Sequence, residues 1–264
     1  MPILTDTHIH STFSSDGKST IPEHCESAIS KGFTHICITD HLEFNPLDGG
    51  YGFLTDHGKY FDAIERARDT YGGRLTLLSG CEVGGGPHNF PREYEECLAR
   101  PYDFVLCSVH DWYQGLFASD MATDPMPIPL EESYDVYWDE VYKTVTYGGF
   151  DSLAHIDFPK RYYGSVIYDW DKLAQIFEVM TKNDIALEIN TSSLRKGRAN
   201  EAMPGKELLT FYKKCGGRML TVGSDAHVSS DIGAGFPEIE PLTKGFDLLR
   251  YRGRNRENMQ LTYH

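Results

Sequence analysis

Histidines and carboxylates recur at the ends of short apolar runs along the chain, in a pattern that fits metal binding. His8 and His10 stand two residues apart, and a strand would place both imidazoles on one side, about 7 Å apart. Later runs are followed by further candidate ligands: His41, Glu82, His110, His155, Asp225 and His227. Such nitrogen and oxygen ligands, without paired thiolates, suit Zn²⁺, Mn²⁺ or Fe at a reactive site rather than a closed structural zinc site. The set is too large for one ion, so we expect two or three ions that share carboxylates.

Seven short runs of apolar and β-branched residues are the candidate strands that would position these ligands. They cover residues 3–7, 35–39, 75–81, 104–109, 152–154, 185–189 and 219–223. Most are continuously apolar, which is typical of strands covered on both faces. Segments with helical periodicity separate them, as at Leu173, Ile176, Phe177 and Met180.

This alternation predicts an α/β fold with a parallel sheet, closed or nearly closed into a distorted seven-stranded (β/α) barrel of the TIM type. An open doubly wound sheet is the alternative, but it usually carries a Gly-rich phosphate loop after its first strand, which this chain lacks. In a barrel the candidate ligands would all project from the carboxyl-terminal rim of the strands, where barrel enzymes place their chemistry. We therefore expect a metal centre at that rim.

Length and composition narrow the function classes. The chain has 264 residues, 40% hydrophobic and 24% charged, which fits one domain over residues 1–264. The formal net charge of −14 disfavours nucleic acid and anionic membranes as partners and leaves a small-molecule substrate. We expect no membrane span and no secretion signal, and the six cysteines, which form no C-x-x-C pair, fit reduced thiols in the cytoplasm. Residues 253–264 are polar and predict a loosely held tail.

In its motifs the chain resembles the polymerase and histidinol phosphatase (PHP) family over essentially its whole length. The matching blocks are Asp6-Thr7-His8-Ile9-His10, Thr39-Asp40-His41, Gly80-Cys81-Glu82, Ser108-Val109-His110, His155 and Ser224-Asp225-Ala226-His227. Within the family it is similar to the histidinol phosphate phosphatase branch, through residues 188–196 and through Lys160-Arg161 after His155. The resemblance implies a seven-stranded barrel with a trinuclear metal centre.

The resemblance also implies how three divalent ions, Mn²⁺, Zn²⁺ or Fe, would be held. The first ion would take His8, His10, Glu82 and Asp225. Glu82 would bridge to a second ion held by His110 and His155, and His41 and His227 would hold the third. Many members carry a histidine six residues after the His-x-His pair, where this chain has Asp16. An oxygen ligand there would favour Mn²⁺ or Fe over Zn²⁺, whereas the alternative explanation of Asp16 is an Asp-Gly turn.

The reaction implied by the resemblance is hydrolysis of L-histidinol phosphate to L-histidinol and phosphate, a step of histidine biosynthesis. Arg161 and Arg195 are the expected catalytic phosphate clamp, since a guanidinium can hold two phosphate oxygens, although either could be a surface residue. The further expected substrate contacts are Lys160 and Arg198 for the phosphate, and Glu43 or Asp48 for the amine and imidazole. Asp225 or His227 would relay a proton to the leaving alkoxide.

Three other functions fit part of the pattern. The same fold could act on another phosphoester, such as a nucleotide or a phosphotyrosine peptide. An amidohydrolase-type deaminase also opens with His-x-His, but that class commonly has a lysine after the fourth strand, where His110 stands here, and it gives Glu82 no role. A metal-binding protein without catalytic activity is the remaining alternative.

Overall fold

A parallel sheet forms the centre of the molecule in the computed structural model, which describes residues 2–47 and 56–259. Its strands follow one another in space in chain order: β1 (Thr5–Asp6), β2 (His35–Glu43), β3 (Thr76–Gly84), β4 (Phe104–Cys107), β7 (Ser152–Leu153), β8 (Ala186–Asn190), β9 (Met219–Gly223), β10 (Asp247–Arg252) and β11 (Asn255–Asn258). All neighbours pair in parallel except β10 and β11, which form an antiparallel hairpin. A separate two-stranded sheet pairs β5 (Asp111–Tyr113) with β6 (Leu116–Phe117).

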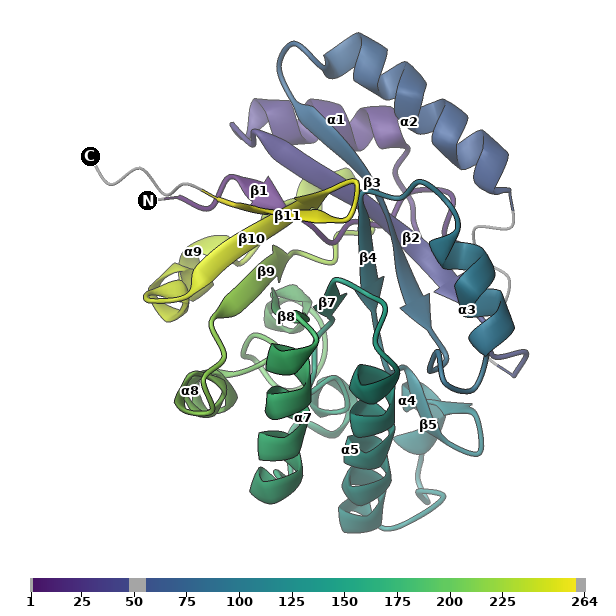
Figure 1. Cartoon of the computed structure of the whole chain (residues 1–264), viewed down its shortest axis with the longest axis vertical. Helices are drawn as coiled ribbons and strands as arrows, with labels where there is room; N and C mark the ends of the chain where they lie inside the picture. The colour runs from purple at the N-terminus through teal and green to yellow at the C-terminus, as the bar shows by residue number, and fades with distance from the viewer. Residues whose placement is uncertain (1, 48–55, 260–264) are drawn as a thin grey trace.

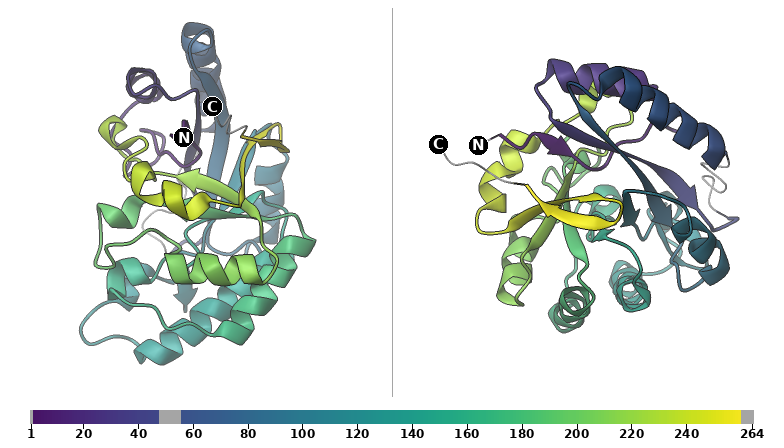
Figure 2. Two further views of the ribbon diagram at one scale, coloured as in Figure 1. Left: turned by 90° about the vertical axis from the view of Figure 1, so that its left-hand side faces the viewer. Right: turned by 45° about the horizontal axis from the view of Figure 1, so that its top comes forward.

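The helices lie outside the strands and surround them, as the right-hand view of Figure 2 shows. The longer ones are α1 (Ile21–Ser30), α2 (His57–Tyr71), α3 (Pro91–Leu98), α5 (Leu130–Tyr147), α7 (Trp170–Lys182) and α8 (Lys206–Lys214). Short helices are α4 (Ala118–Met121), α6 (Lys160–Tyr163), α9 (Phe236–Ile239), η1 (Ser192–Leu194), η2 (Ser229–Asp231) and η3 (Glu240–Thr243). In Figure 1, α1 and α2 cover one end of the sheet, while α5, α7 and α8 cover the other.

The apolar stripes of the helices face the sheet, as the periodicity predicts. The four stripe residues of α7, namely Leu173, Ile176, Phe177 and Met180, are fully buried in one core with the side chains of the strands. This burial removes apolar surface from water and is the main source of stability for such a layered fold. All six cysteines are free thiols, and five of them are buried. Within residues 2–47 and 56–259, no helix has the length and apolar character needed to cross a bilayer.

The parallel α/β prediction is confirmed, whereas the closed seven-stranded barrel is not. Each of the seven predicted runs contains a strand, but in the described part of the chain the sheet has nine strands and is not closed by a continuous ladder. The segments that follow β1 and β9 meet in an isolated parallel bridge between Ile9 and Ala226. Next to it, the Thr7 N–H donates a hydrogen bond of 2.9 Å to the Val222 carbonyl.

The two additional strands form a hairpin in which β10 buries Leu248, Leu249 and Tyr251 and β11 is polar. In β11 most residues are exposed, and Arg250 of β10 pairs across the hairpin with Glu257 at 2.8 Å. The two-residue turn at Gly253 and Arg254 has positive φ at both positions, which suits a tight hairpin turn. The loosely held tail predicted for this region is wrong for residues 255–258, which form β11. The sequence did not indicate this strand because it has no apolar run. Residues 260–264 lie outside the described part of the chain.

Candidate metal centre

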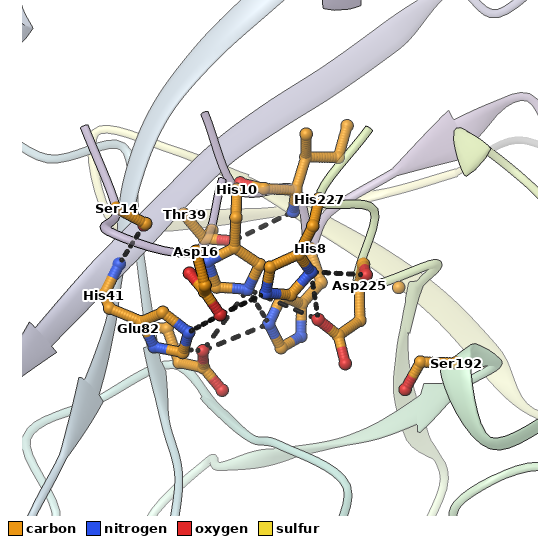
Figure 3. A network of polar contacts seen from close by, with 12 residues as sticks. His8, His10, Ser14, Asp16, Thr39, His41, Glu82, Ser192, Asp225 and His227 are labelled. Carbon is orange, nitrogen blue, oxygen red and sulfur yellow. Dashed lines mark hydrogen bonds and ion pairs between the residues drawn. The ribbon is translucent and has the colours of Figure 1, made fainter. Parts of the chain in front are cut away.

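The predicted ligands come together at one end of the parallel strands. Figure 3 shows His8, His10, Asp16, His41, Glu82, Asp225 and His227 converging from separate strands and loops. Beside them is a cavity of about 540 Å³, whose walls include Asp16, His41, Glu82, His110, His155, Asp225 and His227. His8 and His10 are fully buried and do not line the cavity. The structure therefore places all nine predicted ligands in one cluster.

Strand pairing explains the central part of this cluster. The strands β2 and β3 run longer than their apolar runs predict, so His41 and Glu82 lie within strands rather than in the loops after them. The two residues are direct partners in the parallel ladder between these strands. Glu82 therefore projects into the middle of the cluster from a rigid element.

A first group of ligand atoms surrounds one oxygen of Glu82. Its Oε2 lies 3.3 Å from Nε2 of His8 and 3.4 Å from Nε2 of His10. The two Nε2 atoms are 2.9 Å apart, and Asp225 Oδ1 lies 3.4 Å from Nε2 of His10. These four residues are the set expected around the first ion.

A second group faces the other oxygen of Glu82. Oε1 lies 3.1 Å from Nε2 of His155 and 3.5 Å from Nε2 of His110. It also accepts a hydrogen bond from the Ser108 hydroxyl. A carboxylate with one oxygen in each group is placed as a bridging ligand would be.

The third group lies at the mouth of the cavity. Asp16 Oδ2 is 2.8 Å from Nε2 of His227 and 3.6 Å from Nε2 of His41, and its side chain is 49% exposed. The imidazole of His10 stacks on that of His41 with ring centroids 4.2 Å apart. Asp16 therefore faces both histidines expected at the third ion, and it does more than form a turn.

Two of the clustered residues have strained backbones. His155 has a φ of 22° and Asp225 a φ of 54°, in the left-handed region that non-glycine residues rarely adopt. Such conformations cost roughly 1–3 kcal/mol each and persist where the surrounding structure holds them, often at functional sites. The strain indicates that the surrounding structure holds these two side chains in the cluster.

Charge in the cluster is balanced between carboxylates and histidines. Burial alone would lower the pKa of His110, but the nearby charges of Glu43 and Glu82 raise this pKa to about 10. Burial acts to raise the pKa of Glu82, yet the charges of His8, His41 and His110 hold it well below its usual range. These charges keep Glu82 ionised and favour protonation of His110. A bound cation would take the place of that proton, since it requires a neutral imidazole and an ionised carboxylate.

The residues present fit divalent ions such as zinc. Among the described residues, Glu82 Oε2 and His10 Nδ1 are buried atoms without a hydrogen bond, although Glu82 Oε2 is close to histidine nitrogens. A buried polar atom left this way is costly unless another partner satisfies it. Within residues 2–47 and 56–259, four sets of three residues have ligand atoms within 4.8 Å of one another. Two of these sets belong to the first and second groups, one joins His10 to His41 and His227, and one joins Glu43 to His41 and His110. Imidazole nitrogens with carboxylate oxygens match the donor preferences of Zn²⁺ and Mn²⁺.

The expected cationic residues have different surroundings. Arg161 lines the cavity, with Nη1 at 3.4 Å from Asp225 Oδ2. Arg195 is not part of the lining: its Nη2 donates to the Ser224 carbonyl at 2.7 Å, and its Nε pairs with Asp231 at 3.3 Å. Lys196, the next residue, lines the cavity instead. The sequence identified this segment but not which of its side chains enters the cavity.

Three further residues expected to contact substrate lie outside the cavity lining. Lys160 is 1% exposed and its Nζ lies 2.7 Å from Asp157, so it is held inside the protein. Arg198 is exposed and lies outside the cavity lining. Glu43 is buried against His110, with 2.9 Å between Oε1 and Nδ1, and does not line the cavity. Asp48 lies outside the described residues.

The wall beside the second group is aromatic, which the sequence analysis missed. The Phe158 ring stacks on His155 with centroids 4.6 Å apart, and Phe117 and Tyr162 pack around Phe158. All three aromatic residues line the cavity, as does the carboxylate of Asp231. No local pattern marks these residues, because they lie in loops and short elements whose side-chain directions depend on tertiary packing.

Comparison with known proteins supports the family resemblance. A model of the PHP domain matches residues 6–192. A probable histidinol-phosphatase of Thermotoga maritima is 31% identical over 249 residues, covering 92% of this chain and 93% of the relative. A histidinol-phosphatase of Lactococcus lactis subsp. lactis is 27% identical, covering 85% and 84% of the two chains.

One solved structure has the same fold over nearly the whole length of both chains. The crystal structure of histidinol phosphate phosphatase from Lactococcus lactis subsp. lactis, complexed with zinc, L-histidinol and phosphate, matches with a TM-score of 0.84. Its sequence is 25% identical, and the match covers 96% of this chain and 98% of that chain. Together with the family model over residues 6–192, these likenesses establish that the chain belongs to the PHP domain family.

Proposed function

We propose that this chain is a metal-dependent phosphomonoesterase that hydrolyses L-histidinol phosphate to L-histidinol and inorganic phosphate. The observation that carries the proposal is a buried cluster of histidines around both oxygens of Glu82, opening into a cavity with Arg161 at its wall. The substrate is inferred from the relatives named histidinol-phosphatase and from the similar structure complexed with zinc, L-histidinol and phosphate. A cytoplasmic location stays a prediction.

We assign the three groups of ligands to three divalent ions within one metallohydrolase domain over residues 1–264. Bound ions of this kind lower the pKa of water to roughly 7 and stabilise charge on phosphate oxygens. Zinc is bound in the similar crystal structure, and Mn²⁺ or Fe would suit the oxygen of Asp16. The bridge from Ile9 to Ala226 supports the interpretation of the first seven strands of the sheet as a distorted barrel that brings these groups together.

The chain's own side chains would bind and orient the substrate. Arg161, oriented by Asp225, and Lys196 supply positive charge for the phosphate, and a guanidinium can hold two phosphate oxygens. The aromatic wall of Phe117, Phe158 and Tyr162 would receive the imidazole ring, and Asp231 would face the ammonium group. Asp225 or His227 would deliver a proton to the leaving alkoxide; Asp225 Oδ1 lies 3.3 Å from His227 Nδ1.

Phosphate release after metal exchange tests the function. Chelated protein should release no phosphate from L-histidinol phosphate, and reloading with Zn²⁺, Mn²⁺ or Fe should restore steady-state turnover. A nucleotide monophosphate and a phosphotyrosine peptide serve as comparison substrates. A higher kcat/KM for either of them would replace the proposed substrate, and turnover that survives complete chelation would contradict the metal-dependent reaction.

Replacing Lys160 with methionine should destabilise the protein without affecting substrate binding. The substitution leaves the carboxylate of Asp157 buried without its cation, which should lower the free energy of unfolding by about 3 kcal/mol. The KM for L-histidinol phosphate should stay within about threefold, because Lys160 lies outside the cavity lining. Urea unfolding and steady-state kinetics measure the two quantities.

The matched control for this prediction is Lys172→Met. Lys172 pairs with Asp139 at 2.6 Å on the surface, where loss of an ion pair costs at most about 1 kcal/mol. If Lys160→Met instead keeps full stability and raises KM, Lys160 binds substrate as the sequence suggested.

A further inference from the structure

Two buried glutamates stand behind the ligand histidines and belong to none of the three ligand groups. Glu188 is fully buried and Glu43 is 4% exposed. Each contacts residues from two different groups. Their surroundings indicate how the groups are held relative to one another.

Glu188 links the first and second groups. Its Oε1 lies 2.7 Å from Nδ1 of His8, whose Nε2 faces Glu82. Its Oε2 accepts a hydrogen bond of 3.0 Å from the backbone N–H of His155, the residue with the strained φ. An ionised carboxylate only accepts hydrogen bonds, so it keeps the His8 proton on Nδ1 and leaves the lone pair of Nε2 for an ion.

Glu43 links the second and third groups in a similar way. Its Oε1 lies 2.9 Å from Nδ1 of His110 and 3.2 Å from Nδ1 of His41. The other ring nitrogens of these histidines face Glu82 and Asp16 respectively. His41 Nδ1 is also 3.1 Å from Glu82, so Glu43 shares this contact, whereas it orients His110 directly.

A glycine on a neighbouring strand makes room for each of these carboxylates. Gly84 is the ladder partner of Glu43, and a Cβ at position 84 would overlap the Glu43 carboxylate. A Cβ at Gly223 would overlap both Glu188 Oε1 and Cβ of His8. The chain thus leaves space at two independent positions for the contacts that the two glutamates make.

We propose that Glu188 and Glu43 are positioning residues, each shared by two metal sites, so that Glu188 supports the first and second sites and Glu43 the second and third. The inference rests on the proposed metal-dependent function and deepens it. Groups that orient a ligand histidine typically contribute 10–100-fold to metal affinity. Because each glutamate contacts two groups, its loss should lower the affinity of the protein for the ions at two sites and leave the affinity at the third site unchanged.

Zinc titration of isosteric variants tests this assignment without relying on activity. Metal-free wild type, Glu188→Gln and Glu43→Gln are titrated with Zn²⁺ against a chromophoric chelator, and bound zinc per chain is counted by elemental analysis. We expect each variant to bind two of the three zinc ions with about 10–100-fold lower affinity than the wild type. Glutamine keeps the size of the side chain, so loss of packing alone would not produce this result.

Removing the third site identifies which ions are affected. In an Asp16→Ala background, Glu188→Gln should lower the zinc affinity of both remaining sites. Glu43→Gln should lower the affinity of the second site and leave that of the first site unchanged. The control is Asp151→Asn, because Asp151 is also buried and accepts a backbone hydrogen bond, from Val105 at 2.8 Å, but pairs with Arg254 away from the cluster. It should keep all zinc affinities of the parent protein.

Two outcomes overturn the inference. One is wild-type zinc affinity in both glutamine variants. The other is an equal loss at every site in both variants, which would indicate a general loosening of the fold. Failure of the proposed function gives a different result, namely a wild-type protein that binds zinc but releases no phosphate from L-histidinol phosphate.

Discussion

Glu82→Gln is expected to lower kcat/KM for L-histidinol phosphate by roughly 10³-fold or more, because one substitution removes a charge shared by two ligand groups. One oxygen of Glu82 lies within 3.4 Å of two histidine nitrogens of the first group, and the other lies 3.1 Å from His155. The glutamine amide has the same shape but cannot bridge two cations. Bound zinc, measured by elemental analysis, should fall together with activity.

A glutamate that pairs with a histidine elsewhere provides the control. Glu140 lies 2.9 Å from Nε2 of His88, outside the cavity lining. Glu140→Gln should keep kcat/KM within about twofold, as expected for a substitution remote from the reacting groups. Full zinc content and near wild-type turnover in Glu82→Gln would contradict the assignment of Glu82 as the bridge.

Arg161→Met is expected to lower kcat/KM by roughly 10²-fold while leaving zinc content unchanged. Among the described residues, Arg161 is the arginine in the cavity lining, and its contact with Asp225 directs the guanidinium toward the ligand cluster. Arg161→Lys should recover only part of the loss, because an ammonium cannot hold two phosphate oxygens in the planar geometry of a guanidinium. Steady-state kinetics with inorganic phosphate as a competitive inhibitor would show weaker phosphate binding in both variants.

Arg198→Met is the matched control for Arg161→Met. Arg198 is exposed and lies outside the cavity lining, so its loss should change kcat/KM by less than about threefold. Unchanged kinetics in Arg161→Met, or an equal loss in Arg198→Met, would move the phosphate contact to another cation, with Lys196 as the next candidate.

The substrate contacts were less accessible to sequence reasoning than the ligand cluster. Arg195 and Lys196 are adjacent in the chain, yet only Lys196 enters the cavity, because the backbone after η1 turns the Arg195 side chain toward the Ser224 carbonyl. Side-chain directions can be predicted from the sequence where a helix or strand repeats regularly, but a turn has no such repeat. The same limit applies to the aromatic wall and to the burial of Lys160.

The amino-acid sequence by itself determined that this chain has a parallel α/β sheet and that its histidines and carboxylates meet at one edge. The physical reason is that parallel strands all end on the same side, so a residue placed at a strand end has a known destination before any packing is known. Only the tertiary structure decided that Glu188 and Glu43 lie behind the ligand histidines and contact their Nδ1 atoms. The sequence predicted a substrate contact for Glu43 and no role for Glu188, because their actual contacts depend on strand register and on the space left by Gly84 and Gly223.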